Sequence, residues 1–246
     1  MKRCFHKALW GVYHTSKKDS RLIQRRARTD GWISKILNNK YQFDFRTYVF
    51  GSDNFKYLED LGVKNMVLVD SNPAPFDLLT EQYRNKLEAI KACFEEGYTE
   101  VCHQDWDVIP QREIDENFWT IMNNGAEFQA NLQQYRRIKT RWRSSYSQDL
   151  RKIPNGGMFY LRDKKHLDGV IRCWEQLRAK TNSYPSCEPP MAMYVEELMG
   201  GKWLGKDEYF KQGFEPLTCD LHRCSCYGSD KEIKAQKTLY FLHYQG

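Results

Sequence analysis

The stretch "YRNKLEAIKACFEEGYTEVCHQDWDVIP", residues 83–110, decides the fold prediction. Apolar residues recur at steps of three or four through its first half, which predicts an amphipathic helix over residues 76–98. Gly97 ends this helix, and "EVCHQDWDVI" (100–109) follows as a predicted strand. A helix followed at once by a strand is the repeating unit of a parallel α/β sheet.

The same alternation runs through the rest of the chain. It predicts a single α/β domain over residues 1–246, with a mostly parallel central sheet flanked by helices. Ligands bind such sheets at the carboxyl ends of the strands. The other predicted strands are 7–15, 43–51, 64–71, 126–135, 156–162 and 238–244, and the other predicted helices are 20–39, 166–179 and 190–200.

The composition is that of a folded protein with a slight basic excess. Hydrophobic residues make up 41% of the 246 residues, which is enough for a core and too many for a disordered chain. The net charge of +6 fits an anionic ligand without identifying one. The eight cysteines show no regular spacing, which favours reduced thiols over disulfides. The apolar run near the N-terminus is too short for a signal peptide, and no apolar run in the sequence reaches the roughly 18 residues that a membrane span needs. We therefore expect a soluble, cytoplasmic protein.

An acidic pair ends the predicted strand 100–109. Asp105 and Asp107 are two residues apart, so on a strand their side chains share one side while Trp106 packs on the other. Carboxylate oxygens suit Mg²⁺ or Mn²⁺, which often also hold substrate phosphates. His103 has the same parity but lies further back. The pair alone fits either a metal site or a solvated strand end.

The stretch resembles the nucleotide-binding core of GT-A glycosyltransferases. That family has an Arg-Asn pair early in a helix, small residues along it, a Gly-aromatic turn, and a strand ending in D-x-D. The resemblance implies a GT-A fold, in which the D-x-D holds a divalent metal on the diphosphate of a nucleotide-sugar donor. The matching residues are Arg84, Asn85, Ala89, Ala92, Gly97, Tyr98, Asp105 and Asp107.

Two further motifs agree with this family. "PNGGMFYLRD" (154–163) is similar to its glycine turn into a strand, which implies that Asn155, Gly156 and Gly157 line the donor-sugar and acceptor pocket. Paired glycines would also let the backbone approach a ligand closely.

The other motif lies at the C-terminus. "FLHYQG" (241–246) resembles the His-x-x-Gly of the glycogenin-like members, so His243 is implied as the third metal ligand. Its nitrogen favours Mn²⁺ over Mg²⁺. The acidic residue that contacts the nucleoside in many members has no clear match, and Asp53 or Asp70 is the candidate. The resemblance divides the chain into a donor-binding half, about 1–110, and an acceptor-binding half, about 111–246.

The implied reaction is transfer of a sugar from a nucleotide diphosphate to an acceptor hydroxyl. An inverting enzyme needs a general base, which the family usually places at a helix start after the glycine turn. "YVEELM" (194–199) makes Glu196 or Glu197 the candidate. A retaining enzyme would use the same region to position the sugar. The same sequence also fits two exposed helix glutamates with no catalytic role.

The acceptor prediction rests on "QQYRRIKTRWRSSYSQDLRK" (133–152), which holds seven basic residues and one acidic residue with aromatics between them. Basic residues bind phosphates, and aromatic side chains stack on bases or sugars. Arg141, Trp142 and Arg143 are the acceptor-binding candidates. The acceptor could be a polyanion such as DNA carrying a hydroxylated base, a glycan, or a lipid-linked sugar at an anionic membrane. A loop that clamps the donor diphosphate would show the same pattern.

Other functions remain open from the sequence. The basic segment 134–152 also fits a non-catalytic nucleic-acid-binding protein. A sugar nucleotidyltransferase would need a glycine-rich loop after the first strand, where "YHTSKKDSR" has no glycine. Four residues of the zinc-ligand types lie close together without a C-x-x-C pair, so ordinary loop thiols are the simpler interpretation. They are Cys219, His222, Cys224 and Cys226.

Overall fold

The computed structural model describes most of the sheet and the helices that pack on it. The described residues are 2–9, 43–60, 62–69, 84–105, 108–110, 114–134, 152–181, 187–200, 213–217, 222–224 and 240–243. The predicted helix 20–39 and most of the basic segment 134–152 lie outside them.

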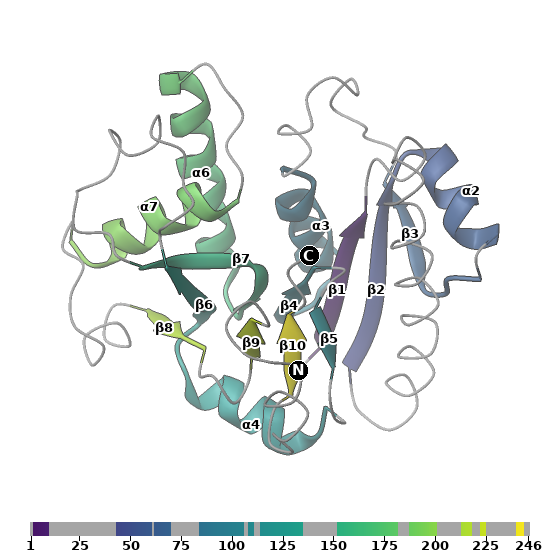
Figure 1. Ribbon diagram of the computed structural model, residues 1–246, viewed down its shortest axis with the longest axis horizontal. Helices are drawn as coiled ribbons and strands as arrows, with labels where there is room; N and C mark the ends of the chain where they lie inside the picture. Colours follow the sequence, from purple (N-terminus) through teal and green to yellow (C-terminus); the bar gives the residue numbers. More distant parts are fainter. Residues whose placement is uncertain are drawn as a thin grey trace.

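A seven-stranded sheet forms the centre of the protein (Figure 1). In spatial order the strands are β3 (Met66–Val69), β2 (Phe43–Phe50), β1 (Arg3–Leu9), β4 (Glu100–Gln104), β7 (Lys152–Leu161), β6 (Phe128–Gln134) and β8 (Phe214–Pro216). β3, β2, β1 and β4 are parallel neighbours, β7 runs antiparallel to β4 and β6, and β8 is parallel to β6. This confirms the predicted mostly parallel sheet.

Helices cover both faces of this sheet. α3 (Arg84–Glu95), α6 (Lys164–Thr181) and α7 (Glu188–Leu198) share one core cluster on one face. α4 (Glu116–Asn124) packs in a separate cluster on the other, and α2 (Ser52–Asp60) packs beside β2. In Figure 1, α7 lies above β7 and α4 lies at the bottom of the view.

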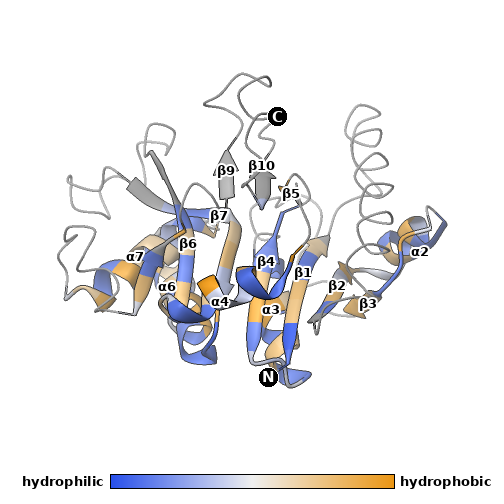
Figure 2. Cartoon of the chain, turned by 90° about the horizontal axis from the view of Figure 1, so that it is seen from below, coloured by the Kyte–Doolittle hydropathy of each residue, from blue (hydrophilic) through white to orange (hydrophobic). Residues whose placement is uncertain are grey.

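Alternation along β1 builds these two core layers. Cys4 and Ala8 belong to the cluster beneath α3, whereas Phe5 packs against Phe118 and Trp119 of α4. Successive side chains of a strand point to opposite faces, so a strand covered on both sides carries apolar residues at both parities. Figure 2, which views the molecule from below, shows hydrophobic colour over much of β1 and over part of β4.

A second sheet of three short strands lies beside the end of β4. It consists of β5 (Val108–Pro110), β10 (Phe241–His243) and β9 (His222–Cys224), and β10 is antiparallel to β5 and parallel to β9. The prediction of one strand over residues 100–109 is therefore wrong. The chain leaves the large sheet after Gln104 because Val108 pairs with His243 of β10. Strand alternation cannot then be used to align Asp105 with the residues that follow it.

Other element boundaries also differ from the prediction. β7 begins at Lys152, so Asn155, Gly156 and Gly157 lie inside the strand and do not form a turn before it. β1 begins at Arg3, four residues before the predicted strand. α4 was missed, although Asp115 caps it by accepting a hydrogen bond from the Phe118 amide at 3.0 Å, a recognisable helix start. α2 and the short strands β5, β8 and β9 were also missed.

α3 confirms the central part of the predicted helix 76–98. Leu87 and Ile90 of the predicted apolar stripe are buried, and Gly97 follows the helix with a φ of +83° that suits glycine. None of the helices within the described ranges is long and apolar enough to cross a membrane. The five cysteines whose side chains the structure describes are buried free thiols, namely Cys4, Cys93, Cys102, Cys173 and Cys187.

Candidate functional site

The end of β4, the start of α3, the middle of β7 and the start of α7 meet around Asp105. Asp105 directly follows β4, and its backbone N–H donates to the carbonyl of Gly157 on β7 at 2.7 Å. Its own carbonyl accepts from the Val108 amide at 3.1 Å. These two bonds fix the backbone of Asp105 between the two sheets.

Two side chains hold the carboxylate of Asp105 by the same oxygen. Lys86 Nζ lies 2.5 Å and His103 Nε2 lies 3.2 Å from Oδ1. Burial alone would raise the pKa of Asp105, but the Lys86 ammonium and the His103 hydrogen bond hold that pKa well below its usual range. Burial would lower the pKa of Lys86, but the charge of Asp105 keeps it well above its usual value. The pair is therefore ionised at neutral pH.

Lys86 was not among the predicted site residues. Its side chain is buried, and Nζ also donates to the carbonyl of Gly156 at 3.3 Å. One signal in the sequence could have found it. Lys86, Ile90 and Cys93 are spaced i, i+4 and i+7, so the lysine lies on the buried stripe of α3, where a charge needs a partner.

The Asn155–Gly157 segment of β7 forms the wall next to Asp105. Asn155 is buried, and its Oδ1 accepts a hydrogen bond from the Gly157 amide at 2.7 Å. A Cβ at Gly156 would lie 2.2 Å from Cys187 Sγ and 3.0 Å from Glu188 Oε1. At Gly156 the close neighbour is therefore the start of α7, which packs directly on the strand backbone.

Glu188 is an acidic residue near Asp105 that the sequence analysis did not predict. It is the first residue of α7, and its charge is one of those that raise the pKa of Lys86. A carboxylate in the first turn of a helix is also stabilised by the helix dipole. Its position over Gly156 places it on the same side of the site as Lys86.

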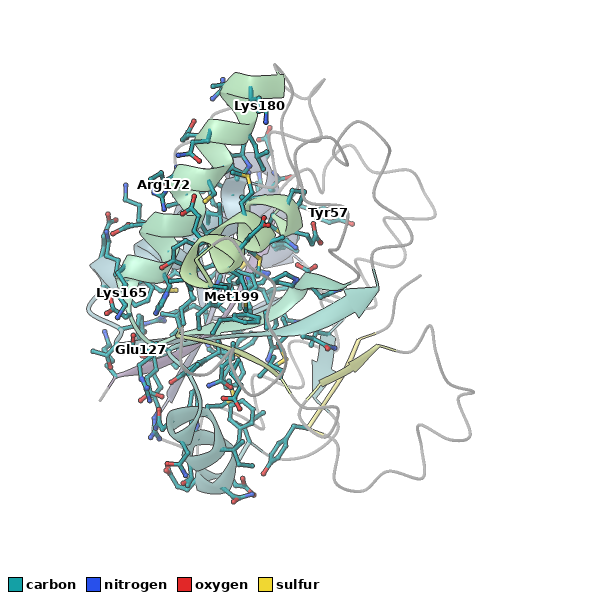
Figure 3. All side chains as sticks on the ribbon, turned by 90° about the vertical axis from the view of Figure 1, so that its left-hand side faces the viewer. Tyr57, Glu127, Lys165, Arg172, Lys180 and Met199 are labelled. Atoms are coloured by element: carbon teal, nitrogen blue, oxygen red, sulfur yellow. The ribbon has the colours of Figure 1, made fainter. Side chains whose placement is uncertain are left out.

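The predicted catalytic pair lies elsewhere on α7. The helix begins at Glu188, so Glu196 and Glu197 belong to its last turn. Both oxygens of Glu197 accept hydrogen bonds from Arg172 of α6, at 3.2 and 2.5 Å. Figure 3 shows Arg172 part of the way along α6. Burial raises the pKa of Glu196.

The predicted Arg-Asn pair has two different environments. Arg84 Nε donates to Glu88 Oε1 at 2.7 Å, Nη1 lies 3.4 Å from Glu175 Oε1, and the guanidinium lies over the ring of Trp174. These contacts join α3 to α6. Asn85 is buried, and its Oδ1 has no hydrogen-bond partner among the described residues.

The register of the small sheet brings the strand of His243 to the site. His243 pairs with Val108, the residue that follows Asp107 in the chain and that donates to the carbonyl of Asp105. Asp107 and the side chain of His243 lie outside the described residues. Within the parts that are described, no three His, Cys, Asp or Glu side chains gather closely enough to hold a metal ion. The donor set still suits one, because Asp105 offers a carboxylate that is ionised and 28% exposed.

Comparisons with known proteins give matches to solved structures only. No family model and no curated sequence matches the chain. Mouse xyloside xylosyltransferase 1 is 14% identical with a TM-score of 0.54, over 100% of this chain and 98% of that one. The galactosyltransferase LgtC, solved with donor and acceptor sugar analogues, is 12% identical with a TM-score of 0.52, and the match covers 100% of this chain and 87% of the other. A glycosyltransferase involved in the glycosylation of the major capsid of PBCV-1 is 10% identical with a TM-score of 0.50. That match covers 100% of this chain and 94% of the other.

The chain has the GT-A fold. These matches extend over the whole chain, and they confirm the fold that the D-x-D, Arg-Asn and glycine motifs imply. At this level of identity the likeness establishes the fold and leaves the roles of single residues to the geometry described above.

Several predicted residues of this GT-A fold are not described by the structure. Their predicted roles in donor, metal and acceptor binding stay predictions. They are Asp70, Asp107, Arg141, Trp142 and Arg143, together with the side chain of His243 and the side chains of the cysteine–histidine group at 219–226. Asp53, the alternative to Asp70, is exposed in the first turn of α2.

Proposed function

We propose that this protein is a metal-dependent glycosyltransferase that moves a sugar from a nucleotide-diphosphate-sugar to an acceptor hydroxyl. One observation carries the proposal: Asp105, at the carboxyl end of β4, is held by Lys86 and by the backbone of Gly157, beside the strand that carries His243. The carboxyl ends of parallel strands are where α/β sheets bind ligands. The likeness to three solved glycosyltransferase structures supports the same conclusion.

Asp105, Asp107 and His243 would hold the cation. Two carboxylates and one imidazole suit Mn²⁺, with Mg²⁺ as the alternative. A cation bound there supplies Lewis-acid neutralisation of the charge that develops on the diphosphate as the sugar departs. The proposal thus assigns the acidic pair and the C-terminal histidine to one site.

Lys86 would supply a fixed positive charge beside the same diphosphate. Its ammonium is desolvated and held by Asp105 and the Gly156 carbonyl, so it needs no reorganisation when the donor binds. Asn155, Gly156 and Gly157 would line the sugar side of the donor. Their backbone is already bonded to Asp105 and Lys86, which links the position of the sugar to that of the carboxylate.

Glu188 is the favoured acidic residue for the sugar and the acceptor hydroxyl. It lies over Gly156 and close to Lys86. Glu197, at the other end of α7, is instead paired with Arg172 of α6. In an inverting reaction Glu188 would take the proton of the acceptor hydroxyl as general base. In a retaining reaction it would position the sugar. The anomeric configuration of the product distinguishes the two.

The acceptor-binding half is proposed to be about residues 111–246. Arg141, Trp142 and Arg143 would bind an anionic or sugar acceptor through charge and stacking. The LgtC structure contains an acceptor sugar analogue, and the mouse enzyme is named for a xyloside, so a glycan acceptor fits these neighbours best. A hydroxylated base in DNA is the alternative acceptor. A cytoplasmic location stays a prediction.

A thermal-shift screen with UDP-, GDP- and dTDP-sugars tests the proposal, with each donor added in Mn²⁺ and in EDTA. A donor at about 100 times its dissociation constant stabilises the fold by about 2.7 kcal/mol, which gives a clear rise in Tm. We expect the rise only in Mn²⁺, with slow hydrolysis of the same donor, and loss of both in Asp107→Ala. The proposal fails if no donor shifts Tm or is hydrolysed. Salt-dependent DNA binding that survives Asp107→Ala would instead favour a nucleic-acid-binding protein.

A further inference from the structure

The two contacts of the Asp105 carboxylate leave its two oxygens unequal. Lys86 Nζ and His103 Nε2 both contact Oδ1. No hydrogen bond to Oδ2 is made by any of the residues that the structure describes. The carboxylate is therefore held by one oxygen and presents the other.

His103 is fixed for this contact by rings on the two neighbouring strands. Its side chain is 1% exposed, and its ring lies 4.8 Å from that of His6 on β1 and 4.9 Å from that of Phe159 on β7. The strand register places these residues side by side across the sheet. A ring packed on both sides cannot turn away from Asp105. Since Oδ1 is an acceptor, Nε2 carries the proton and donates.

His103 and Lys86 therefore do different things to the same oxygen. Lys86 brings a positive charge from α3 that also reaches the Gly156 carbonyl, whereas His103 brings a directed N–H from β4, two residues before Asp105. Charge alone does not determine which oxygen of a carboxylate faces outward. A directed donor in a fixed ring does, because rotation of the carboxylate would break its hydrogen bond.

We propose that His103 is a positioning residue, which fixes Oδ1 of Asp105 so that Oδ2 alone is offered to the divalent cation of the donor. The inference rests on the proposed function, because it assigns Asp105 as a metal ligand. Partners that orient metal ligands change metal affinity about 10- to 100-fold when they are removed. His103 is thus expected to affect cation binding without touching donor or acceptor.

The test is direct titration of the full chain with Mn²⁺ alone. Binding is measured as the decrease of the free Mn²⁺ signal in electron paramagnetic resonance. His103→Phe keeps a ring between His6 and Phe159 but removes the N–H, and should raise the dissociation constant about 10- to 100-fold. His103→Gln keeps a donor near the position of Nε2 and should bind Mn²⁺ nearly as the wild type does. Rescue by glutamine separates orientation of Asp105 from ring packing.

His166→Phe is the matched control. His166 is equally buried and its Nε2 lies 3.2 Å from Glu127 Oε2, but it belongs to α6 and contacts Tyr194 of α7. It makes the same kind of imidazole–carboxylate contact outside the site. His166→Phe should leave the Mn²⁺ affinity unchanged, and thermal unfolding without Mn²⁺ reports any general loss of stability in each variant.

The outcomes separate this inference from the proposed function. Suppose that the wild type binds Mn²⁺, that Asp105→Asn abolishes this binding, and that His103→Phe binds as tightly as the wild type. The metal site would then be supported, but His103 would not position Asp105. Equal losses in His103→Phe and His103→Gln also overturn the inference, because they indicate packing. If the wild type binds no Mn²⁺, or binds it equally after Asp105→Asn, both the proposed metal site and this inference are wrong.

Discussion

Lys86 on α3 and Asp105 at the end of β4 form a partly buried ion pair with 2.5 Å between Nζ and Oδ1. The pair joins a helix to the strand end where the acidic motif begins, and the same ammonium reaches the Gly156 carbonyl on β7 at 3.3 Å. Three elements of the fold thus meet at one charge.

Replacing Lys86 should impair donor turnover more than folding. Lys86→Met keeps the length of the side chain but removes the fixed charge beside the diphosphate. Loss of one preorganised electrostatic group typically lowers kcat about 100- to 1,000-fold. Steady-state kinetics with the donor found by the screen measures this.

Lys91→Met is the control for Lys86→Met. Lys91 lies on α3 as well, but its side chain is 45% exposed, and among the described residues it pairs with Glu95 alone, at 3.8 Å. Its replacement should leave turnover unchanged. Equal kinetics in both variants and the wild type would show that Lys86 takes no part in the reaction.

The two ends of α7 should differ in their effect on catalysis. Glu188→Gln removes the carboxylate near Lys86 and should lower kcat about 100-fold or more, as expected for loss of acid–base or charge stabilisation. Glu197→Gln breaks the exposed pair with Arg172, which should cost at most about 1 kcal/mol of stability and leave kcat unchanged. The opposite ranking of the two variants would restore Glu197 as the catalytic candidate.

Gly156 should tolerate no side chain while Cys187 is present. In Gly156→Ala the new Cβ meets Cys187 Sγ at 2.2 Å, so the start of α7 must move off β7. Overpacking of this kind costs about 1–3 kcal/mol in the free energy of unfolding, which urea denaturation measures. Cys187→Ala removes the obstructing sulfur. Adding Gly156→Ala to Cys187→Ala should therefore lower the free energy of unfolding by less than adding Gly156→Ala to the wild type. An equal loss with and without the sulfur would contradict the packing account.

His6 should make the protein less stable in mild acid. Burial, and then the nearby His103, lower the pKa of His6 well below its usual value. The unfolded chain takes up a proton near pH 6.5 that the folded chain excludes, so stability falls as the pH falls below about 6.5. His6→Phe removes this proton and should flatten the fall by about 1.4 kcal/mol per pH unit. Urea denaturation at pH 7, 6 and 5 tests it, and parallel pH profiles would contradict it.

The sequence predicted the local elements well where one periodicity was clear. The buried stripe of α3, the glycine that follows it and the apolar strands beside it are local signals, because each depends on residues a few positions apart. The same is true of the acidic pair and the paired glycines as motifs. These signals were enough for the α/β class and for the GT-A fold.

The boundaries at the site could not be predicted in this way. β4 stops before Asp105 because a distant strand, β10, competes for the residues that follow it. Asn155–Gly157 lies within β7 because that strand pairs with both β4 and β6. A pairing partner far along the chain decides such cases, and local periodicity carries no information about it.

The sequence by itself determined the fold class and the residue types that the site would need. Only the tertiary structure decided which of them meet: it brought Lys86 and His103 to one oxygen of Asp105, placed Glu188 over Gly156, turned Arg84 toward Glu175, and paired Glu197 with Arg172. The physical reason is that a helical lysine or arginine can reach several acidic partners. Burial and the packing of α3, α6 and α7 select one among them.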